Sequence, residues 1–570
     1  MLNIKAIIID GYVDEPACFG VPPYISPYIR YIAGALRERG IPENNIHYRT
    51  IDSIRSQPED AGKIIKSAQL VIIVAGMTVP GKYLRSTPIS PGEIESIFSA
   101  SKGAKILGGP IRLGFSKEGG KTATALGISS DDTLVAQADI ESLVYDISKD
   151  GTTKADLQDP THRFRTVEEI GRWGKHGAFI IKKHPDYPHV MCEMETYRGC
   201  GRKKHCSFCT EPSYGPSDYR PVNDVIEEVK ELYNNGARYF RIGRQPDIMS
   251  YHAIDKGGDM PEPDPEVLRK LYKGIREVAP ELKVLHMDNA NPATIAAYPE
   301  KCRDILKTIV KYHTSGDIAA LGMESADPAV IEANDLKVMP DQIFEVIRMI
   351  NEVGGTRGNS GLQELLPGIN FVHGLKGETK NTFEYNYDFL KEVLDSELLL
   401  RRINIRQVMA FPGTKMYGND ELIGKHKKLF LKHKEKVRKD IDLPMLRKVV
   451  PTGTILKDVL CEKNDGNVCF GRQLGSYPLL VGIPAKLPVN SFIDVAVTGH
   501  GHRSITGIPY PLKINTAPAS LIKELPGIGK KQAVTIHSKA PFSSEAEFLK
   551  YAENNEKILQ YIDLNNRQNA

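Results

Sequence analysis

The stretch that decides the fold covers residues 198–212 and reads RGCGRKKHCSFCTEP. It contains Cys200, Cys206 and Cys209, with five residues between the first two cysteines and two residues between the second two. A structural zinc site uses four ligands and a disulfide framework uses an even number of cysteines, so three thiols on one loop indicate a different use. A zinc site completed by His205 stays open as an alternative.

The composition is that of an ordinary folded protein. Of the 570 residues, 41% are hydrophobic and 26% are charged, and 75 Lys and Arg against 71 Asp and Glu leave a net charge of +4. These values indicate neither disorder nor, by themselves, a nucleic-acid partner. A chain of this length is too long for a single hydrophobic core, so we expect roughly three or four domains.

The cysteine usage and the apolar runs suggest a location. Eight cysteines, three of them on one loop, do not form the pattern of a secreted disulfide scaffold. The N-terminal MLNIKAIIIDGY has a short apolar run that ends at an aspartate, which is typical of a buried strand rather than a signal peptide. No stretch approaches the ~20 apolar residues that span a bilayer. We therefore expect a cytoplasmic protein that does not act at a membrane.

Residues 1–165 alternate strand and helix patterns at the spacing of βαβ units. A helix is expected over residues 26–40, opened by Ser-Pro and closed by Gly40. The apolar runs predict buried parallel strands within residues 4–10, 45–52, 69–78 and 104–110. The pattern predicts an open, doubly wound, Rossmann-like sheet with its ligand at the carboxyl ends of the strands.

A second alternating series covers residues 185–420. Six strand patterns are separated by helical stretches and lie within residues 189–199, 237–247, 282–292, 318–328, 366–379 and 402–414. They predict a partial (β/α)6 barrel whose functional loops follow the strand C-termini. The cysteine triplet comes directly after the first of these strands.

Three smaller units follow. Residues 421–450 are expected to form a basic helical linker, because residues 425–439 contain eight Lys or Arg against one Glu. Residues 451–515 are rich in strand patterns and predict a small β-barrel. Residues 516–570 contain LIKELPGIGKKQAV, an apolar helix followed by a Pro-Gly-Ile-Gly turn and a second helix that opens with lysines.

Three thiolates on a loop at a barrel mouth can bind three irons of a cubane cluster and leave the fourth iron open. This arrangement resembles the radical S-adenosylmethionine (radical SAM) superfamily. Most members have a shorter first spacing than the five residues found here, which is a known but less common variant. The resemblance implies that Cys200, Cys206 and Cys209 bind a 4Fe–4S cluster whose open iron coordinates SAM.

The resemblance extends to the cluster loop and to the ends of three later strands. Family motifs match an aromatic residue before the last cysteine and polar or glycine residues at the strand ends. The residues implied to bind SAM are Phe208, Gly243, Arg244, Gln245, Glu324, Ser325, Gly374 and Glu378. The implied reaction is cleavage of SAM by an electron from a low-potential donor, followed by hydrogen abstraction from an unactivated carbon. No catalytic side chain is assigned.

A doubly wound domain before a radical SAM barrel resembles the cobalamin-dependent methyltransferases of the superfamily. The resemblance implies methylcobalamin between the two domains. Since the chain has no Asp-x-His-x-x-Gly motif, we expect no protein histidine on cobalt. Loop position alone suggests the cobalamin contacts Thr78, Val79, Pro80, Tyr83, Leu84 and Gly109. The alternative is a Rossmann-like domain that serves packing only.

The C-terminal units keep an RNA-modifying enzyme open as an alternative. The predicted small barrel resembles a TRAM domain, which occurs on tRNA methylthiotransferases, and LPGIGKKQA resembles a helix-hairpin-helix that can hold phosphate. Methylthiotransferases carry three further N-terminal cysteines for a second cluster, whereas this chain has only Cys18 there. Methylthiolation is therefore disfavoured, while RNA methylation is not.

The overall layout resembles an archaeal group of cobalamin-dependent radical SAM methyltransferases. It implies a protein or peptide substrate, and the candidate that this resemblance suggests is a glutamine of methyl-coenzyme M reductase. RNA is the second choice of partner.

Overall fold

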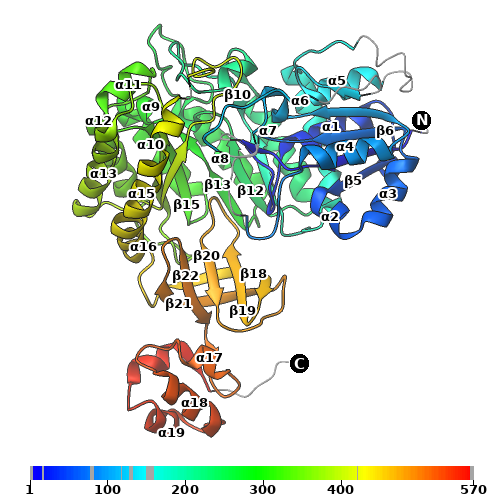
Figure 1. Ribbon diagram of the computed structural model, residues 1–570. Helices are drawn as coiled ribbons and strands as arrows, with labels where there is room; N and C mark the ends of the chain where they lie inside the picture. Colours follow the sequence, from blue (N-terminus) through cyan, green and yellow to red (C-terminus); the bar gives the residue numbers. More distant parts are fainter. Residues whose placement is uncertain are drawn as a thin grey trace.

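The computed structural model describes residues 4–15, 18–77, 83–116, 119–127, 133–148, 160–419 and 421–564 (Figure 1). An N-terminal α/β unit lies beside a larger α/β unit, and a small β-barrel with a helical end lies below them in this view. Among the described residues, no helix is long and apolar enough to cross a membrane.

The N-terminal unit is the open parallel sheet that the sequence predicts. Its strands are β1 (Ala6–Asp10), β5 (Ile46–Thr50), β6 (Leu70–Val74), β7 (Ala104–Gly108) and β8 (Thr133–Val135), in the spatial order β5-β1-β6-β7-β8. Every pairing is parallel. Strands β1 and β6 are buried at every position, which explains their unbroken apolar runs. The strand order reverses at β1, so the ligand crevice is expected at the carboxyl ends of β1 and its neighbours.

The larger unit contains the six parallel strands of the predicted partial barrel. In chain order they are β9 (Met191–Glu195), β12 (Tyr239–Arg244), β13 (Val284–Met287) with its continuation β14 (Asn289–Ala290), β15 (Asp317–Glu324), β16 (Leu365–His373) and β17 (Arg402–Gln407). They form two sheets, β13-β12-β9-β4 and β14-β15-β16-β17, with a break at Asp288. The additional strand β4 (Tyr24–Ile25) comes from the N-terminal segment and pairs in parallel with β9. The N-terminal unit is therefore joined to the first barrel strand by backbone hydrogen bonds.

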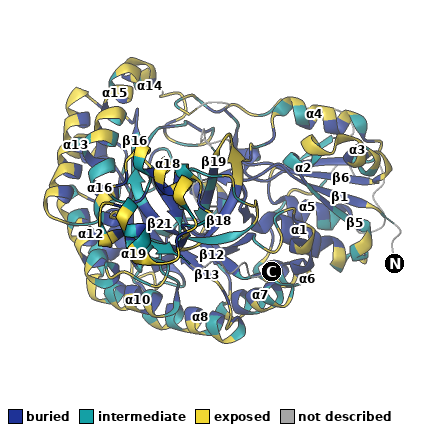
Figure 2. Ribbon diagram, turned by 90° about the horizontal axis from the view of Figure 1, so that it is seen from below, coloured by how far each residue is buried: buried dark blue, intermediate teal, exposed yellow. Residues whose placement is uncertain are grey.

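Helices cover the outside of these sheets and are exposed on their outer faces (Figure 2). Around the barrel they include α7 (Val222–Asn234), α8 (Pro265–Val278), α10 (Pro299–Tyr312), α12 (Pro340–Gly354) and α13 (Lys380–Asp395). In the N-terminal unit α1 (Pro27–Glu38) contacts α5 (Ile140–Ile147) and α6 (Val167–His176). Trp173 of α6 is fully buried against Tyr31 and Ala35 of α1. The helix that the sequence predicts over residues 26–40 corresponds to α1.

The C-terminal part contains a closed five-stranded barrel, as predicted from the strand patterns. Its strands are β18 (Ile455–Asp465), β19 (Val468–Gln473), β20 (Leu480–Ile483), β22 (Ser504–Pro509) and β21 (Phe492–His500), in this spatial order. Three short helices follow, α17 (Ala519–Ile522), α18 (Lys530–Lys539) and α19 (Glu545–Tyr551). Assignment of these two parts to TRAM and helix-hairpin-helix families stays a prediction.

The basic stretch is a set of helices with one buried face. These are α14 (Glu421–Lys425), α15 (Lys427–Val437) and α16 (Leu443–Val449). Phe430, His433 and Val437 of α15 are buried, while its lysines Lys427, Lys428 and Lys432 are exposed. The stretch is thus bound to the barrel on one side and presents cations to solvent on the other.

Candidate active site

The cysteine loop is held between two short antiparallel strands. β10 (Tyr197–Arg198) pairs with β11 (Asp218–Tyr219), so that the chain between them forms a closed loop above β9. The loop begins at Gly199, which has a φ of +83°, and a Cβ there would lie 2.4 Å from the carbonyl oxygen of Pro216. Only glycine fits this close approach of the two ends of the loop.

Two of the three cysteines, Cys206 and Cys209, belong to one apolar cluster. Cys206 is buried, while Cys200 and Cys209 are half-buried. Cys206 packs with Phe208 and Cys209 in a cluster whose other members come from the end of β16 and from the segments that follow β15, β16 and β17. Arg202 Nη1 donates to Cys206 Sγ at 3.4 Å. The loop therefore turns its sulfurs toward the carboxyl ends of the barrel strands.

The ammonium group of Lys337 lies close to all three thiols. Burial raises the pKa of Cys200 and of Cys206, and Lys337 opposes this shift in both. Burial also lowers the pKa of Lys337, but the negative charges of Cys206, Glu324, Cys209 and Cys200 outweigh it and leave that pKa raised. Because metals bind the thiolate form, a cation at this position favours the ligating state of the cysteines.

This donor set fits an iron–sulfur cluster. Three thiolates are soft ligands of the kind that iron–sulfur clusters use, and each binds a different iron. Within the part of the chain that the structure describes, no three His, Cys, Asp or Glu side chains converge so as to hold a single metal ion. The alternative zinc site that adds His205 to the cysteines stays a prediction.

Glu324 ends β15 beside Lys337. Its φ is +67°, which is unusual for a residue other than glycine. A Cβ at Gly322 would lie 2.5 Å from Glu324 Oε1 and 2.7 Å from Lys337 Nζ, so both side chains cross the space above this glycine. Burial raises the pKa of Glu324, and Lys337 and Arg406 oppose the shift. Ser325 accepts a hydrogen bond from the backbone N–H of Asp327 at 3.1 Å and shapes the turn.

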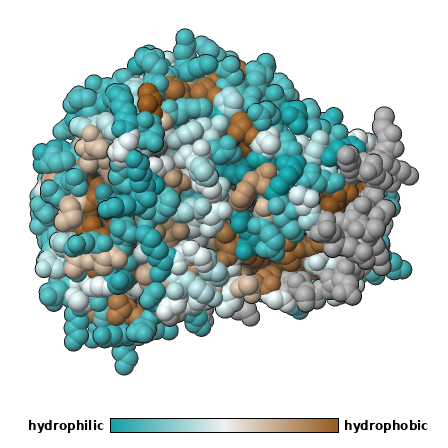
Figure 3. Space-filling view, turned by 90° about the horizontal axis from the view of Figure 1, so that it is seen from above, coloured by the Kyte–Doolittle hydropathy of each residue, from teal (hydrophilic) through white to brown (hydrophobic). Residues whose placement is uncertain are grey.

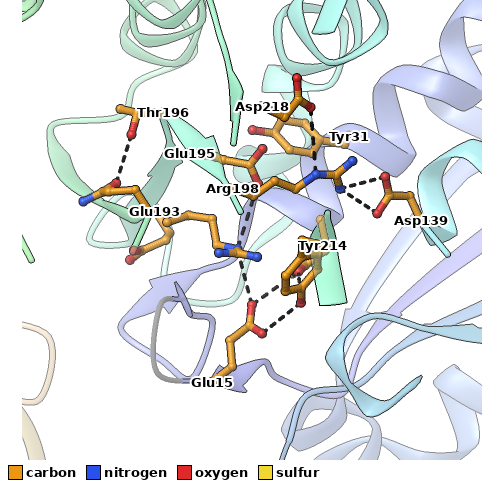
Figure 4. Close-up of polar contacts among 12 residues, drawn as sticks. Glu15, Tyr31, Asp139, Glu193, Glu195, Thr196, Arg198, Tyr214 and Asp218 are labelled. Carbon is orange, nitrogen blue, oxygen red and sulfur yellow. Dashed lines mark hydrogen bonds and ion pairs between the residues drawn. The ribbon is translucent and has the colours of Figure 1, made fainter. Parts of the chain in front are cut away.

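Arg244 lies in the seam between the N-terminal unit and the barrel. Its guanidinium is within 3.4 Å of Glu15 Oε1 and of Glu211 Oε1, and it lies 4.6 Å from the ring centroid of Tyr214. Glu15 and Tyr214 face each other across the seam, where the Tyr214 hydroxyl donates to Glu15 Oε2 at 3.2 Å (Figure 4). Since Glu211 also accepts from the N–H of Gly199 at 2.9 Å, the seam is connected directly to the cysteine loop.

The neighbours of Arg244 are enclosed by barrel residues. Gly243 has no room for a side chain, because a Cβ there would lie 1.8 Å from Glu193 Oε1. Gln245 is buried, donates to the carbonyl of Ile242 at 2.8 Å and accepts from the hydroxyl of Thr196 at 3.2 Å. At the end of β12, Gly243 is therefore closely packed and Gln245 is hydrogen-bonded within the chain.

Glu378 connects β16 to the basic helices. Its Oε2 accepts from Gly374 N at 2.8 Å and bonds His373 Nδ1 at 2.9 Å, while its Oε1 bonds His426 Nδ1 at 2.8 Å. Burial raises the pKa of Glu378, but His373 and these hydrogen bonds outweigh it, so the pKa is lowered. The carboxylate therefore has partners within the chain on both oxygens, and it fixes α15 to the end of β16.

The cobalamin candidates are described only in part. Thr78, Val79 and Pro80 lie outside the described residues. Tyr83 and Leu84 are half-buried in the loop after β6, and Gly109 follows β7 with a φ of +91°. Of the described candidates, Gly109 is at the carboxyl edge of the N-terminal sheet, directly after β7.

Sequence reasoning missed Lys337 and Arg112, because nothing in the local pattern marks them. Arg112 follows β7, and its guanidinium lies 5.0 Å from the ring centroid of Tyr214. Its Nη2 is buried and has no hydrogen-bond partner among the described residues. A guanidinium donor enclosed in this way at the seam fits a ligand that supplies an acceptor there.

Apolar surface is visible on the upper face of the molecule. In the view from above, brown patches lie at several places on this face, and some of them are on the right-hand half beside the grey residues (Figure 3). This half carries the N-terminal unit.

The chain matches a family model and several known proteins. Residues 194–390 match the model of the radical SAM superfamily, so the barrel is a radical SAM domain, with a 4Fe–4S cluster and SAM as its cofactors. The solved structure of the radical SAM methyltransferase TsrM from Kitasatospora setae, with cobalamin and a [4Fe–4S] cluster bound, is 12% identical with a TM-score of 0.46, and the match covers 73% of this chain and 77% of that one.

Two archaeal relatives match over almost their full length. A protein of Archaeoglobus fulgidus, named only as uncharacterized, is 42% identical over 95% of this chain and 97% of its own. The uncharacterized protein MJ0274 of Methanocaldococcus jannaschii is 47% identical over 89% of this chain and 93% of its own. The chain belongs to the family that MJ0274 represents, and it carries a radical SAM domain.

Proposed function

We propose that this protein is a cobalamin-dependent radical SAM enzyme that methylates an unactivated carbon of a protein or peptide. The observation that carries the proposal is the contact between the N-terminal unit and the radical SAM domain. The carboxyl edge of the N-terminal sheet meets the cysteine loop there, through Glu15, Tyr214 and Glu211.

The residues present would hold the cofactors at this junction. Cys200, Cys206 and Cys209 would bind the cluster, and Lys337 and Glu324 are the charged groups beside it. Tyr83, Leu84, Gly109 and Arg112 are the candidates on the cobalamin side. When bound, cluster and SAM supply hydrogen abstraction from carbon, and cobalamin supplies a methyl group.

The chain itself positions these groups and keeps water out. Glu15 and Glu211 are buried, and so are Tyr28, Tyr214 and Arg244, with which they make the seam. The Tyr28 hydroxyl donates to Glu15 Oε1 at 3.3 Å. A buried, hydrogen-bonded charge network fixes the distance between two domains better than exposed pairs do.

The choice of a protein substrate rests on the resemblance of the domain layout to an archaeal group of cobalamin-dependent radical SAM methyltransferases. The first candidate substrate is a glutamine of methyl-coenzyme M reductase. The test is an anaerobic assay with the reconstituted protein, cobalamin, a low-potential reductant and methyl-labelled SAM. We expect label in peptides that contain the candidate glutamine. Label in RNA and none in protein would contradict the choice of substrate while leaving the radical SAM chemistry intact.

RNA modification is a second candidate, favoured by the exposed lysines of α15 and by Lys530 and Lys531 at the start of α18. Methylthiolation is disfavoured within it, because Cys18 is the only cysteine of the N-terminal unit and is fully buried. A second cluster would need further thiolates there.

A further inference from the structure

A cavity of about 540 Å³ lies in the N-terminal unit, apart from the cysteine loop. Its wall combines the carboxyl end of β5 and helix α2 (Ile51–Ser56) with the loop after β6 and residues 183–186, which lead into the barrel. Tyr48, Thr50, Ser53, Arg85, Lys183 and His184 are among the residues that line it. This volume is in the range of sites for small molecules, which typically measure about 300–1,000 Å³.

His184 lines this cavity and has an unpartnered donor on its ring. The side chain is 4% exposed, and its Nδ1 accepts a hydrogen bond from the backbone N–H of Asp186 at 3.0 Å. Burial lowers the pKa of His184 to about 4, so the ring is neutral at pH 7. A neutral imidazole that accepts at Nδ1 carries its proton at Nε2. That Nε2–H is buried and has no partner among the described residues, so an acceptor from a ligand would satisfy it.

Lys183 adds a cation without a carboxylate partner. Its Nζ donates to the carbonyl oxygens of Glu43 at 2.7 Å and of Ile46 at 2.6 Å. Among the described residues no carboxylate forms an ion pair with it. Two neutral carbonyls leave both its charge and its third hydrogen available to an anion.

The two carboxylates that line the cavity already form ion pairs with arginines. Asp52 accepts from the Tyr12 hydroxyl at 2.8 Å and pairs with Arg55 at 2.7 Å. Asp186 pairs with Arg85 at 2.8 Å. Neither carboxylate pairs with Lys183, whose charge is favoured by Glu43 outside the lining and opposed by Arg49 within it. The lining itself has more cations than carboxylates, with Arg49, Arg85 and Lys183 against Asp52 and Asp186.

We propose that this cavity binds the phosphate group of a small molecule, held by Lys183 and by the Nε2–H of His184. Phosphate offers several strong acceptor oxygens and a negative charge, which match the unpartnered donor and the unpaired cation. The same chemistry could come from a free nucleotide or from the phosphodiester of cobalamin. The inference about the cavity does not depend on the proposed function, although the second source does.

The test compares probes that differ in phosphate. Calorimetric titration of the full-length protein with adenosine monophosphate, with adenosine and with inorganic phosphate examines the first source. Titration with cobalamin and with cobinamide, which lacks the nucleotide tail, examines the second. We expect at least one phosphate-bearing probe to bind more tightly than its phosphate-free counterpart by about tenfold or more, equal to ~1.4 kcal/mol.

Variants of the lining residues, with matched controls, test whether the phosphate-bearing probe binds in this cavity. Lys183→Met and His184→Phe should remove the preference for phosphate, whereas His184→Gln, which keeps a donor, should restore part of it. Lys182→Met and His176→Phe, at exposed positions, serve as controls. Thermal unfolding of each variant checks that the fold is intact.

The outcomes distinguish the proposed phosphate site from the proposed cobalamin-dependent function. Binding of adenosine monophosphate that depends on Lys183 supports the site, even if cobalamin does not bind and the proposed function fails. Equal affinities for cobalamin and cobinamide, together with no Lys183-dependent binding of either free phosphate probe, would overturn the inference.

Discussion

The hydroxyl of Tyr477 donates to Asp288 Oδ1 at 2.6 Å. Asp288 lies at the break between β13 and β14, and Tyr477 belongs to the loop between β19 and β20 of the C-terminal barrel. Arg402 of β17 lies 3.9 Å from the ring centroid of Tyr477, and Arg241 of β12 pairs with Asp288. A loop of the C-terminal barrel thus reaches strands β12 and β17 of the radical SAM domain and the break between β13 and β14.

Tyr477→Phe should lower stability, because it leaves the buried Asp288 without one of its donors. Hydrogen bonds to charged groups contribute roughly 1.5–3 kcal/mol. Thermal unfolding of the variant should therefore begin at a lower temperature than that of Tyr417→Phe, whose side chain is 46% exposed. Equal unfolding temperatures for the two variants would mean that the contact does not hold the domains together.

Because Asp10 is buried, we predict that the stability of the protein depends on pH. Burial raises the pKa of Asp10 from 3.8 to about 7, despite hydrogen bonds from Tyr48 and from the backbone of Tyr12. Between these two values the unfolded chain loses its proton while the folded chain keeps it, so stability falls as pH rises, by up to ~1.4 kcal/mol per unit. Below pH 3.8 both states are protonated, and above pH 7 both are ionised.

Asp10→Asn should reduce this slope by the share of one carboxyl, because burial also raises the pKa of Asp14 and of Glu193 to about 7, and it should stabilise the protein near pH 8 relative to the wild type. Unfolding temperatures measured from pH 4 to pH 8 provide the check. The exposed Asp388 gives the matched control, Asp388→Asn. An unchanged slope in Asp10→Asn would place the titrating group elsewhere.

Lys337→Met should make the cluster harder to reduce. Loss of a cation beside three thiolates destabilises the more negative, reduced form, and a shift on the order of 60 mV corresponds to a tenfold change for one electron. Redox titration followed by electron paramagnetic resonance measures the potential. Lys337→Arg keeps the charge, and Lys376→Met changes an exposed lysine, so both should leave the potential near that of the wild type.

Binding of tRNA should be weak and strongly dependent on salt. The exposed lysines of α15 and α18 can neutralise phosphates, and each phosphate neutralised releases counterion. We expect affinities in the non-specific range of roughly 10⁻⁴ to 10⁻⁶ M at physiological salt. Filter binding or fluorescence anisotropy measures this. Submicromolar, sequence-selective binding that is lost in Lys427, Lys428, Lys434 and Lys530 variants would instead favour the RNA candidate.

The sequence was sufficient for the parallel sheets and the cysteine loop, because both have local signatures. Unbroken apolar runs such as residues 70–74 mark buried strands, and three cysteines within ten residues mark a cluster loop. The C-terminal barrel was also predicted from its strand patterns, and its closed form is confirmed.

Contacts between distant segments could not be predicted in this way. Tyr477 approaches Asp288, and Glu15 approaches Tyr214, only after the domains have docked. The motif singles out Glu378, but no local pattern indicates that His373 and His426 bind its carboxylate. Lys337 was missed because a lysine in a loop has no local signature.

The most direct test of the proposed function is cobalamin binding by the anaerobically reconstituted protein, followed by electron paramagnetic resonance of its cob(II)alamin form. We predict cobalamin bound without threefold splitting from a protein nitrogen, together with about four irons that are lost when Cys200, Cys206 and Cys209 are all changed to alanine. Failure to bind cobalamin would contradict the account, and about eight irons, partly kept in that variant, would indicate a second cluster instead.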